Sequence, residues 1–146
     1  MIDLLSYTGL RYIEANSFVS PNWVPQMADA LDVMAGITRK KGVTYASLTP
    51  NMKVLEAALG AGVDEVAIFG SASESFSQKN INCSISQSLE RFAPVAKAAL
   101  AAGVSLRGYV SCVIACPYEG AIAPVQARKV TEALLDLGCY QVSLGD

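Results

Sequence analysis

The chain has no histidine and only one tryptophan among its 146 residues. Without histidine, neither a Ser-His-Asp triad nor a Cys-His pair can form within the chain. Charged residues make up only 16% of the sequence. The apolar runs are short and interrupted, far below the roughly 20 residues of a membrane-spanning helix. These absences exclude triad-type catalysis within the chain and give no sign of a membrane protein.

Signals for secretion and for nucleic-acid binding are also missing. The first residues, MIDLLSYTGL, contain no basic segment and no cleavage-site pattern, so we expect no signal peptide and no secretion. The net charge of −2 is scattered along the chain, which argues against nucleic acid as a partner. One basic cluster, Arg39-Lys40-Lys41, is expected at a helix end, where it suits the helix dipole.

The cysteines do not follow a zinc-binding pattern. There are four of them, at positions Cys83, Cys112, Cys116 and Cys139. Their spacing matches no known zinc motif, so we expect reduced thiols rather than a metal site. Cys112 and Cys116 are close enough in sequence to form a redox pair, but buried, inert thiols are the preferred interpretation.

What the chain does contain is a pattern that occurs five times. An amphipathic segment is followed by a glycine and then by an apolar run; the glycines are Gly9, Gly42, Gly62, Gly103 and Gly138. Glycine is favoured just past a helix end, and the residues that follow are rich in Val, Ile, Leu and Tyr, as strands are. The pattern therefore predicts alternating helices and strands.

Three of the helices are indicated by apolar residues spaced three and four apart. They are expected over Val54–Gly62, Ser88–Gly103 and Val125–Gly138. Pro94 should kink the second helix or mark a boundary, whereas Pro124 suits the first turn of the third.

Helix–strand alternation implies a parallel sheet covered by helices, and two folds satisfy it. One is a complete flavodoxin-like doubly wound sheet; the other is a partial TIM (β/α)8 barrel of about five units, whose full form takes about 250 residues. The abrupt end after a strand favours the partial barrel. So do the polar or reactive residues at every strand end: Glu14, Asn16, Ser17, Thr49, Asn51, Ser71, Ser73, Ser111, Cys112, Ser143 and Asp146.

Several of these residues could carry chemistry. Glu14 lies in the apolar run RYIEANSF, where a carboxylate needs a partner; it could hold a cation or a catalytic arginine, or form a structural salt bridge. Arg107 could pair with Glu14 or with another buried acid, and a structural role is favoured. Asp146, three residues after Ser143, could support a metal, or it could be a solvated terminal residue.

The stretch from 71 to 90 reads as a long polar loop, and such loops are usually functional or disordered. Ser84 and Gln87 have the spacing of a capping box, which accounts for the serine structurally. The preceding Lys79, Asn80 and Asn82 have no evident structural task and would suit a ligand that bears phosphate or amide groups.

Five segments resemble the hydroxymethylglutaryl-CoA lyase family. They are IEANSFVSPNWVPQMAD, SLTPN, EVAIFGSASESFSQKNINCSI, RGYVSCVIACPYEG and GCYQVSLGD. They occur in the family's order, without apparent gaps, from Ile2 to Asp146. The resemblance implies a TIM-type barrel and a retro-Claisen cleavage of hydroxymethylglutaryl-CoA to acetyl-CoA and acetoacetate, assisted by Mg²⁺ or Mn²⁺, in leucine breakdown and ketone-body formation.

The resemblance also implies roles for six residues. Glu14 matches the acid that supports the family's catalytic arginine, and Asp146 matches a strand-end aspartate near the substrate and cation. The expected substrate-binding residues are Ser17, Asn80, Ser84 and Ser143. The segment around Trp23 resembles a rigid loop, stiffened by Pro21 and Pro25, that anchors against the barrel mouth.

The family's other active-site motifs have no counterpart here. An Arg-Asp pair on the first strand, His-x-His and asparagine metal ligands and a glycine-rich loop with a catalytic cysteine are all unmatched. We therefore expect residues 1–146 to form a single partial barrel domain, from the first helix through about the sixth strand, that is inactive alone and holds no metal ligand. The complete enzyme would be cytoplasmic or in the mitochondrial matrix, possibly as a homodimer. An acetyl-CoA-condensing synthase of the same superfamily and a five-stranded binding module are the alternatives.

Overall fold

The computed structural model describes residues 1–19, 22 and 24–146. The expected roles of Pro21 and Trp23 lie outside these residues. The helices are α1 (Ile2–Ser6), η1 (Pro25–Met27), α2 (Ala30–Gly36), α3 (Met52–Gly60), α4 (Glu74–Ile81), α5 (Ile85–Ala101) and α6 (Pro124–Asp136). The strands are β1 (Tyr12–Ser17), β2 (Thr44–Leu48), β3 (Glu65–Ser71), β4 (Ser105–Ser111), β5 (Ala115–Cys116), β6 (Gly120–Ala121) and β7 (Gln141–Leu144).

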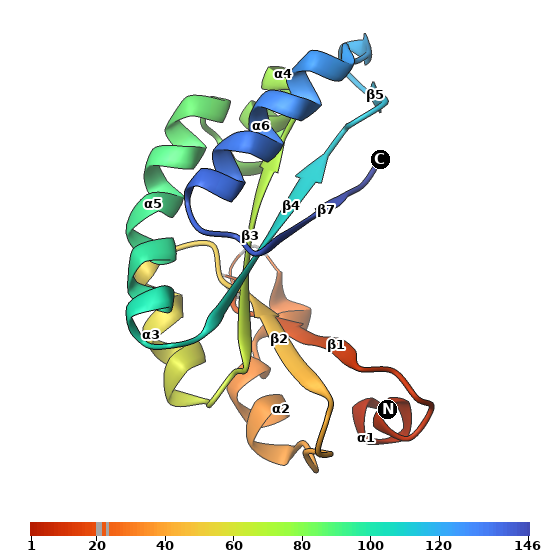
Figure 1. Cartoon of the computed structure of the whole chain (residues 1–146), viewed down its shortest axis with the longest axis vertical. Helices are drawn as coiled ribbons and strands as arrows, with labels where there is room; N and C mark the ends of the chain where they lie inside the picture. Colours follow the sequence, from red (N-terminus) through yellow and green to blue (C-terminus); the bar gives the residue numbers. More distant parts are fainter. Residues whose placement is uncertain (20–21, 23) are drawn as a thin grey trace.

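Five strands form one parallel sheet in the order β1-β2-β3-β4-β7, which is also their order along the chain. A doubly wound sheet would reverse direction at its switch point, whereas a barrel adds strands sequentially with helices on the outside. Figure 1 shows α3, α5 and α6 along one side of the sheet and the C-terminus on the other. The partial barrel is confirmed, and the flavodoxin-like alternative is wrong. We call the side without these helices the bare face.

The five predicted turn glycines are confirmed. Each has a positive φ, between 70° and 100°. Gly138, at the turn from α6 to β7, has φ of 100°, and a Cβ there would lie 2.6 Å from Leu100 Cδ1, the end of a flexible side chain that is 45% exposed. The backbone conformation therefore requires glycine at this turn, whereas the leucine can turn away.

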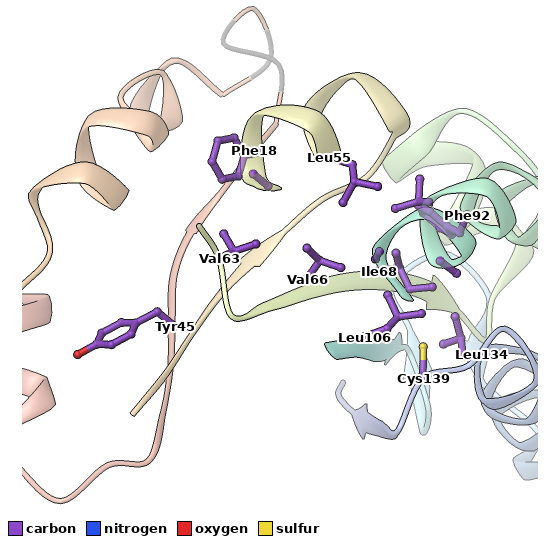
Figure 2. Close-up of a cluster of buried hydrophobic side chains, with 14 of the residues drawn as sticks. Phe18, Tyr45, Leu55, Val63, Val66, Ile68, Phe92, Leu106, Leu134 and Cys139 are labelled. Atoms are coloured by element: carbon purple, nitrogen blue, oxygen red, sulfur yellow. The ribbon is translucent and has the colours of Figure 1, made fainter. Parts of the chain in front are cut away.

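The hydrophobic core lies between the sheet and the helices. Figure 2 shows Val66 and Ile68 of β3 gathered with Leu55 of α3, Phe92 of α5 and Leu134 of α6. All five side chains are at most 3% exposed. Burying a side chain of this size contributes about 1.5–3 kcal/mol, so this face holds the layers together.

Two glycines let α6 approach the sheet closely. A Cβ at Gly70 of β3 would lie 2.8 Å from Val130 Cγ1, and one at Gly108 of β4 would lie 3.2 Å from Leu134 Cδ1. Neither glycine has a left-handed backbone, so the requirement is for space alone. The strands therefore carry glycine where the helix side chains insert.

The edge strand β1 contains a bulge. Glu14 pairs with Ala46, but the next paired residue, Asn16, faces Ser47, so Ala15 is the extra residue. Side chains alternate between the faces of a regular strand, and an inserted residue reverses the alternation beyond it. Asn16 therefore points to the helix side, where its Nδ2 donates to the Ala30 carbonyl at 2.8 Å.

The helix predictions are confirmed with shifted ends. The predicted segments become α3, α5 and α6, and Pro124 occupies the first turn of α6. The proposed boundary at Pro94 is wrong, because α5 continues through it. Pro94 lies on the exposed side of α5, where water can satisfy the carbonyl that loses its partner, and the buried side of the helix keeps its packing.

The prediction of a long polar loop over 71–90 is wrong. Most of this stretch is helical, in α4 and the first turns of α5, and Ser73 caps α4 by accepting a hydrogen bond from the Phe76 amide at 3.0 Å. The helix is hard to read from sequence because it is polar on most sides and packs on the end of the sheet. The short hairpin β5–β6, between β4 and α6, was also not predicted.

Candidate functional site

A cavity of about 1000 Å³ lies at the carboxyl ends of the strands and beside α4. Its lining includes Glu14 of β1, Leu48 of β2, Phe69 of β3, Tyr109 of β4 and Asn80 of α4. Polar and apolar groups thus meet at the edge of the sheet where barrel enzymes build their active sites. The cavity brings together two of the predicted site residues, Glu14 and Asn80.

Glu14 has a partner that the sequence did not reveal. Its Oε2 accepts a hydrogen bond of 2.7 Å from the Tyr109 hydroxyl. Burial raises the pKa of Tyr109, and the bond to Glu14 adds to that rise, so the phenol keeps its proton at neutral pH. Glu14 itself is exposed to the cavity. The carboxylate is held in place, and its Oε1 has no hydrogen-bond partner among residues 1–19, 22 and 24–146.

Arg107 pairs with Glu65 rather than with Glu14. Its Nε lies 2.7 Å from Glu65 Oε1, and both side chains are nearly buried, at 10% and 2% exposed. Its Nη2 donates to Tyr140 Oη at 2.6 Å and its Nη1 to Ser143 Oγ at 3.3 Å. The guanidinium carbon lies 4.3 Å from the ring centroid of Tyr12. These contacts support the structural interpretation of Arg107 and place Ser143 beside it.

Ser17 is positioned by the bulge in β1. It pairs with Leu48, which lines the cavity, so the two residues share a face of the sheet. Its Oγ is buried and is the one such side-chain atom without a hydrogen-bond partner among the described residues. A buried hydroxyl without a partner is costly, which is typical of a group that waits for a ligand or another part of a protein.

Asn80 and Ser84 have different surroundings. Asn80 lies in the last turn of α4, exposed to the cavity, beside Lys79 and Asn82, which also line it. Ser84 begins α5: its Oγ accepts from the Gln87 amide at 3.1 Å while Gln87 Oε1 accepts from the Ser84 amide at 3.0 Å. The capping box is confirmed. Ser84 is not among the residues that line the cavity.

Asp146 is held by the unpredicted hairpin. Its Oδ1 accepts hydrogen bonds from the amides of Ile114, at 3.0 Å, and Ala115, at 3.1 Å. These two bonds hold the pKa of Asp146 below its usual value, so it is ionised at neutral pH. Asp146 is thus exposed to solvent, while the hairpin keeps its carboxylate in one place.

All four cysteines are free and buried, as predicted. Cys112 has a left-handed backbone, with φ of 58°, and burial raises the pKa of its thiol. Burial also acts to raise the pKa of Cys116, but hydrogen bonds from the Ser73 hydroxyl and the Tyr118 amide outweigh it and lower that pKa. Cys116 is thus more ionised than an ordinary cysteine, and its inertness stays a prediction.

The described part of the chain shows no cluster of metal-binding side chains. Within residues 1–19, 22 and 24–146, no three His, Cys, Asp or Glu side chains gather as ligands. Glu14 and Asp146 are each bound to hydrogen-bond donors of the protein instead. In the same ranges, no helix combines the length and the apolar character that crossing a membrane requires.

The comparisons with known proteins all indicate the same family. The family model described as HMGL-like matches residues 1–146. Mitochondrial hydroxymethylglutaryl-CoA lyase of Bos taurus is 60% identical over the whole chain, which spans 45% of that relative. The crystal structure of HMG-CoA lyase from Brucella melitensis is 57% identical, with a TM-score of 0.98 over 99% of this chain and 51% of its own.

A more distant structure includes a ligand. HMG-CoA lyase from Acinetobacter baumannii, in complex with coenzyme A and 3-methylmalate, is 33% identical and has a TM-score of 0.92 over 98% of this chain and 47% of its own. The chain therefore spans about half the length of the relatives it matches. Since the family model covers every residue of the chain, the chain belongs to the HMGL-like family.

Proposed function

We propose that the chain is part of a hydroxymethylglutaryl-CoA lyase, which cleaves its substrate to acetyl-CoA and acetoacetate. The observation that carries the proposal is the match of the entire chain, at 57–60% identity, to lyases of cattle and Brucella. The sheet with its cavity at the carboxyl ends of the strands supports the same reading. Residues 1–146 would form one partial barrel domain within a longer enzyme.

The reaction would require negative charge to be stabilised on the C3 oxygen and then on the thioester enolate. A proton leaves the C3 hydroxyl, the C2–C3 bond breaks, its electron pair passes into the thioester enolate, and a proton returns to C2. Glu14 would hold the catalytic arginine of the longer enzyme through the carboxylate oxygen that Tyr109 leaves free. Asp146, ionised and fixed by the hairpin, would act near the substrate. A divalent cation, Mg²⁺ or Mn²⁺, belongs to the proposal for the complete enzyme, with ligands outside residues 1–146.

The acyl-CoA substrate would lie along the cavity. Lys79 and Asn80 offer a positive charge and amide groups at its rim, which suit the phosphates and amides of coenzyme A. Ser17 offers an unpartnered hydroxyl and Ser143 a hydroxyl beside Arg107. Ser84 would contribute by fixing the start of α5 next to α4. The ligand of the Acinetobacter structure supports this substrate class.

The setting of the complete enzyme is also proposed. A soluble compartment, either the bacterial cytoplasm or the mitochondrial matrix, and a homodimer are the expected arrangement. The mitochondrial name of the cattle relative and the bacterial origin of the Brucella one support the two compartments equally.

The test is to express the complete reading frame that contains this chain and to assay acetoacetate release from hydroxymethylglutaryl-CoA. Glu14→Gln should lower kcat about 100-fold, because the arginine would lose its support and move from its productive position. Glu132→Gln, on the exposed surface of α6, is the matched control and should leave kcat unchanged. Thiol release from acetyl-CoA and a 2-oxo acid, without cleavage activity, would favour the synthase alternative and contradict the proposal.

A further inference from the structure

The bare face of the sheet carries a connected set of side chains from its first, third, fourth and last strands. Arg107 and Glu65 form the ion pair, Tyr12 lies against the guanidinium, and Tyr12 reaches Tyr109, which reaches Glu14. None of these contacts lies in the helix-packed core. The set therefore connects a buried ion pair to the carboxylate at the cavity.

Small residues beneath the set allow these contacts to cross the sheet. Ala46 of β2 pairs with Glu14, and Ala67 of β3 pairs with Arg107. Both alanines are 0% exposed although they alternate with residues that face the helices. Both lie on the bare face beside longer side chains of the neighbouring strands, so a small residue at each position leaves room for contacts that cross the sheet.

The direction of the hydrogen bonds is fixed by counting protons. A neutral phenol has one proton to donate, and Tyr109 donates its proton to Glu14 Oε2 at 2.7 Å. The contact between the Tyr12 and Tyr109 hydroxyls is long, at 3.3 Å, and only Tyr12 has a proton left to donate in it. The chain of donors is Tyr12 to Tyr109 to Glu14, and each hydroxyl polarises the next.

The ring of Tyr12 is held in place from the other side. The Arg107 guanidinium carbon lies 4.3 Å from its ring centroid, and that guanidinium is itself fixed by Glu65 and Tyr140. Tyr140 also donates to Glu65 Oε2 at 2.7 Å, so Arg107, Glu65 and Tyr140 are all bonded to one another. The Tyr12 hydroxyl is thus aimed by a buried ion pair that lies away from the cavity.

We infer that Tyr12 is a positioning residue of the lyase site, acting through Tyr109 to orient Glu14, with the Arg107–Glu65 pair as its anchor. The inference rests on the proposed function of Glu14 for its kinetic consequence. The orientation of Tyr109 by Tyr12 is a property of the structure and can be tested without activity. While the Tyr12 hydroxyl contacts the Tyr109 oxygen, the Tyr109 hydroxyl can direct its own proton only toward Glu14.

The kinetic test uses Tyr12→Phe in the complete enzyme, because this change keeps the ring on Arg107 and removes only the hydroxyl. We expect kcat to fall about two- to tenfold, the scale of one hydrogen bond, with KM changed less than twofold. Tyr7→Phe is the matched control: this ring lies 4.6 Å from Lys40 Nζ and is 68% exposed, and its loss of a hydroxyl should leave kcat unchanged.

A double-mutant cycle separates positioning from a general structural effect. In a Tyr109→Phe background, Tyr12→Phe should cause no further loss of kcat, because the residue through which it acts is gone. If the two losses multiply instead, Tyr12 does not act through Tyr109 and the inference is wrong. Thermal unfolding of each variant shows whether it has kept its fold.

The second test does not depend on catalysis. With 3-fluorotyrosine placed at position 109, the ionisation of that phenol can be followed by absorbance or ¹⁹F NMR. Tyr12→Phe should move the ionisation to higher pH, because the phenolate loses a donor; Glu14→Gln should move it to lower pH, because the phenol loses an acceptor. An unchanged or lowered value in Tyr12→Phe overturns the inference, whereas an inactive wild-type enzyme with these opposite shifts overturns only the proposed function.

Discussion

The two faces of the five-stranded sheet use the same strands in opposite ways. On the helix-covered face, Val66, Ile68, Leu106 and Val110 are at most 1% exposed and pack against helices. On the bare face, charged and phenolic side chains pair with one another across the strands. Because side chains alternate along a strand, one stretch of sequence encodes both. The comparison teaches that the packed face specifies the fold, whereas the bare face carries the candidate site.

The largest expected effect concerns the bare face as a whole. The sheet has an uncovered face, and its outer strands, β1 and β7, each pair on one side only within the described residues, so it lacks the packing that makes unfolding cooperative. The 146-residue chain on its own should show a broad thermal transition with weak near-UV circular dichroism and no lyase activity, whereas the protein from the complete reading frame should melt sharply. A sharp thermal transition of the 146-residue chain would show that the sheet unfolds cooperatively without any other part of a protein packed on its bare face.

The next prediction compares the loss of stability when the nearly buried ion pair of the bare face is broken with the loss when a surface ion pair is broken. Glu65→Ala leaves the Arg107 guanidinium nearly buried without its acid, which should lower the free energy of unfolding of the complete protein by about 3–5 kcal/mol. Glu132→Ala removes the acid from the exposed Arg128–Glu132 pair and should cost less than about 0.5 kcal/mol. Urea denaturation measures both, and equal losses would show that Arg107 is hydrated rather than buried.

A smaller effect tests the packed face. Gly70→Ala places a Cβ 2.8 Å from Val130 Cγ1 on α6, so the complete protein should lose about 1–3 kcal/mol of unfolding free energy. Gly36→Ala is the matched control, since its Cβ would meet nothing within 4 Å in the last turn of α2. That change should be neutral or stabilise by up to about 1 kcal/mol. A Gly70→Ala protein as stable as wild type would mean that α6 can shift without loss.

The smallest effect decides between two roles of one residue. Ser84→Ala removes the cap of α5 and should cost about 1 kcal/mol of unfolding free energy, whereas Ser84→Asp supplies another good cap and should cost little. If Ser84 only begins the helix, KM for the acyl-CoA substrate will follow wild type in Ser84→Asp. A raised KM in the stable aspartate variant would instead place the serine against the substrate.

The architecture was predictable because its signals are local and repeated. Each of the five glycines lies between a helix and the strand that follows it, and this local pattern can be recognised within a few residues. The helix α4 escaped prediction because it is polar and because its place on the sheet end, not its periodicity, decides its structure. The passage of α5 through Pro94 also depended on tertiary packing that the sequence does not display.

The site was predictable only in part. Glu14 was noticed because a carboxylate in an apolar run is unusual, but its partner Tyr109 is 95 residues away and is an ordinary strand residue. Polar residues at strand ends were less informative, since Asn51 and Ser73 cap helices α3 and α4. Capping and ligand binding require the same small polar side chains at the same places, so sequence alone does not separate them.

The bulge in β1 separates the length of this segment from the direction of its side chains. Glu14 and Ser17 are three positions apart, a spacing that would put them on opposite faces of a regular strand; the extra residue, Ala15, lets both lie on the bare face. Deleting Ala15 would leave a regular strand in which Asn16 still pairs with Ser47 and Ser17 with Leu48, each on its present face. A one-residue deletion at the bulge should therefore be tolerated better than deletion of Ile13, which would move Tyr12 to the face opposite Glu14.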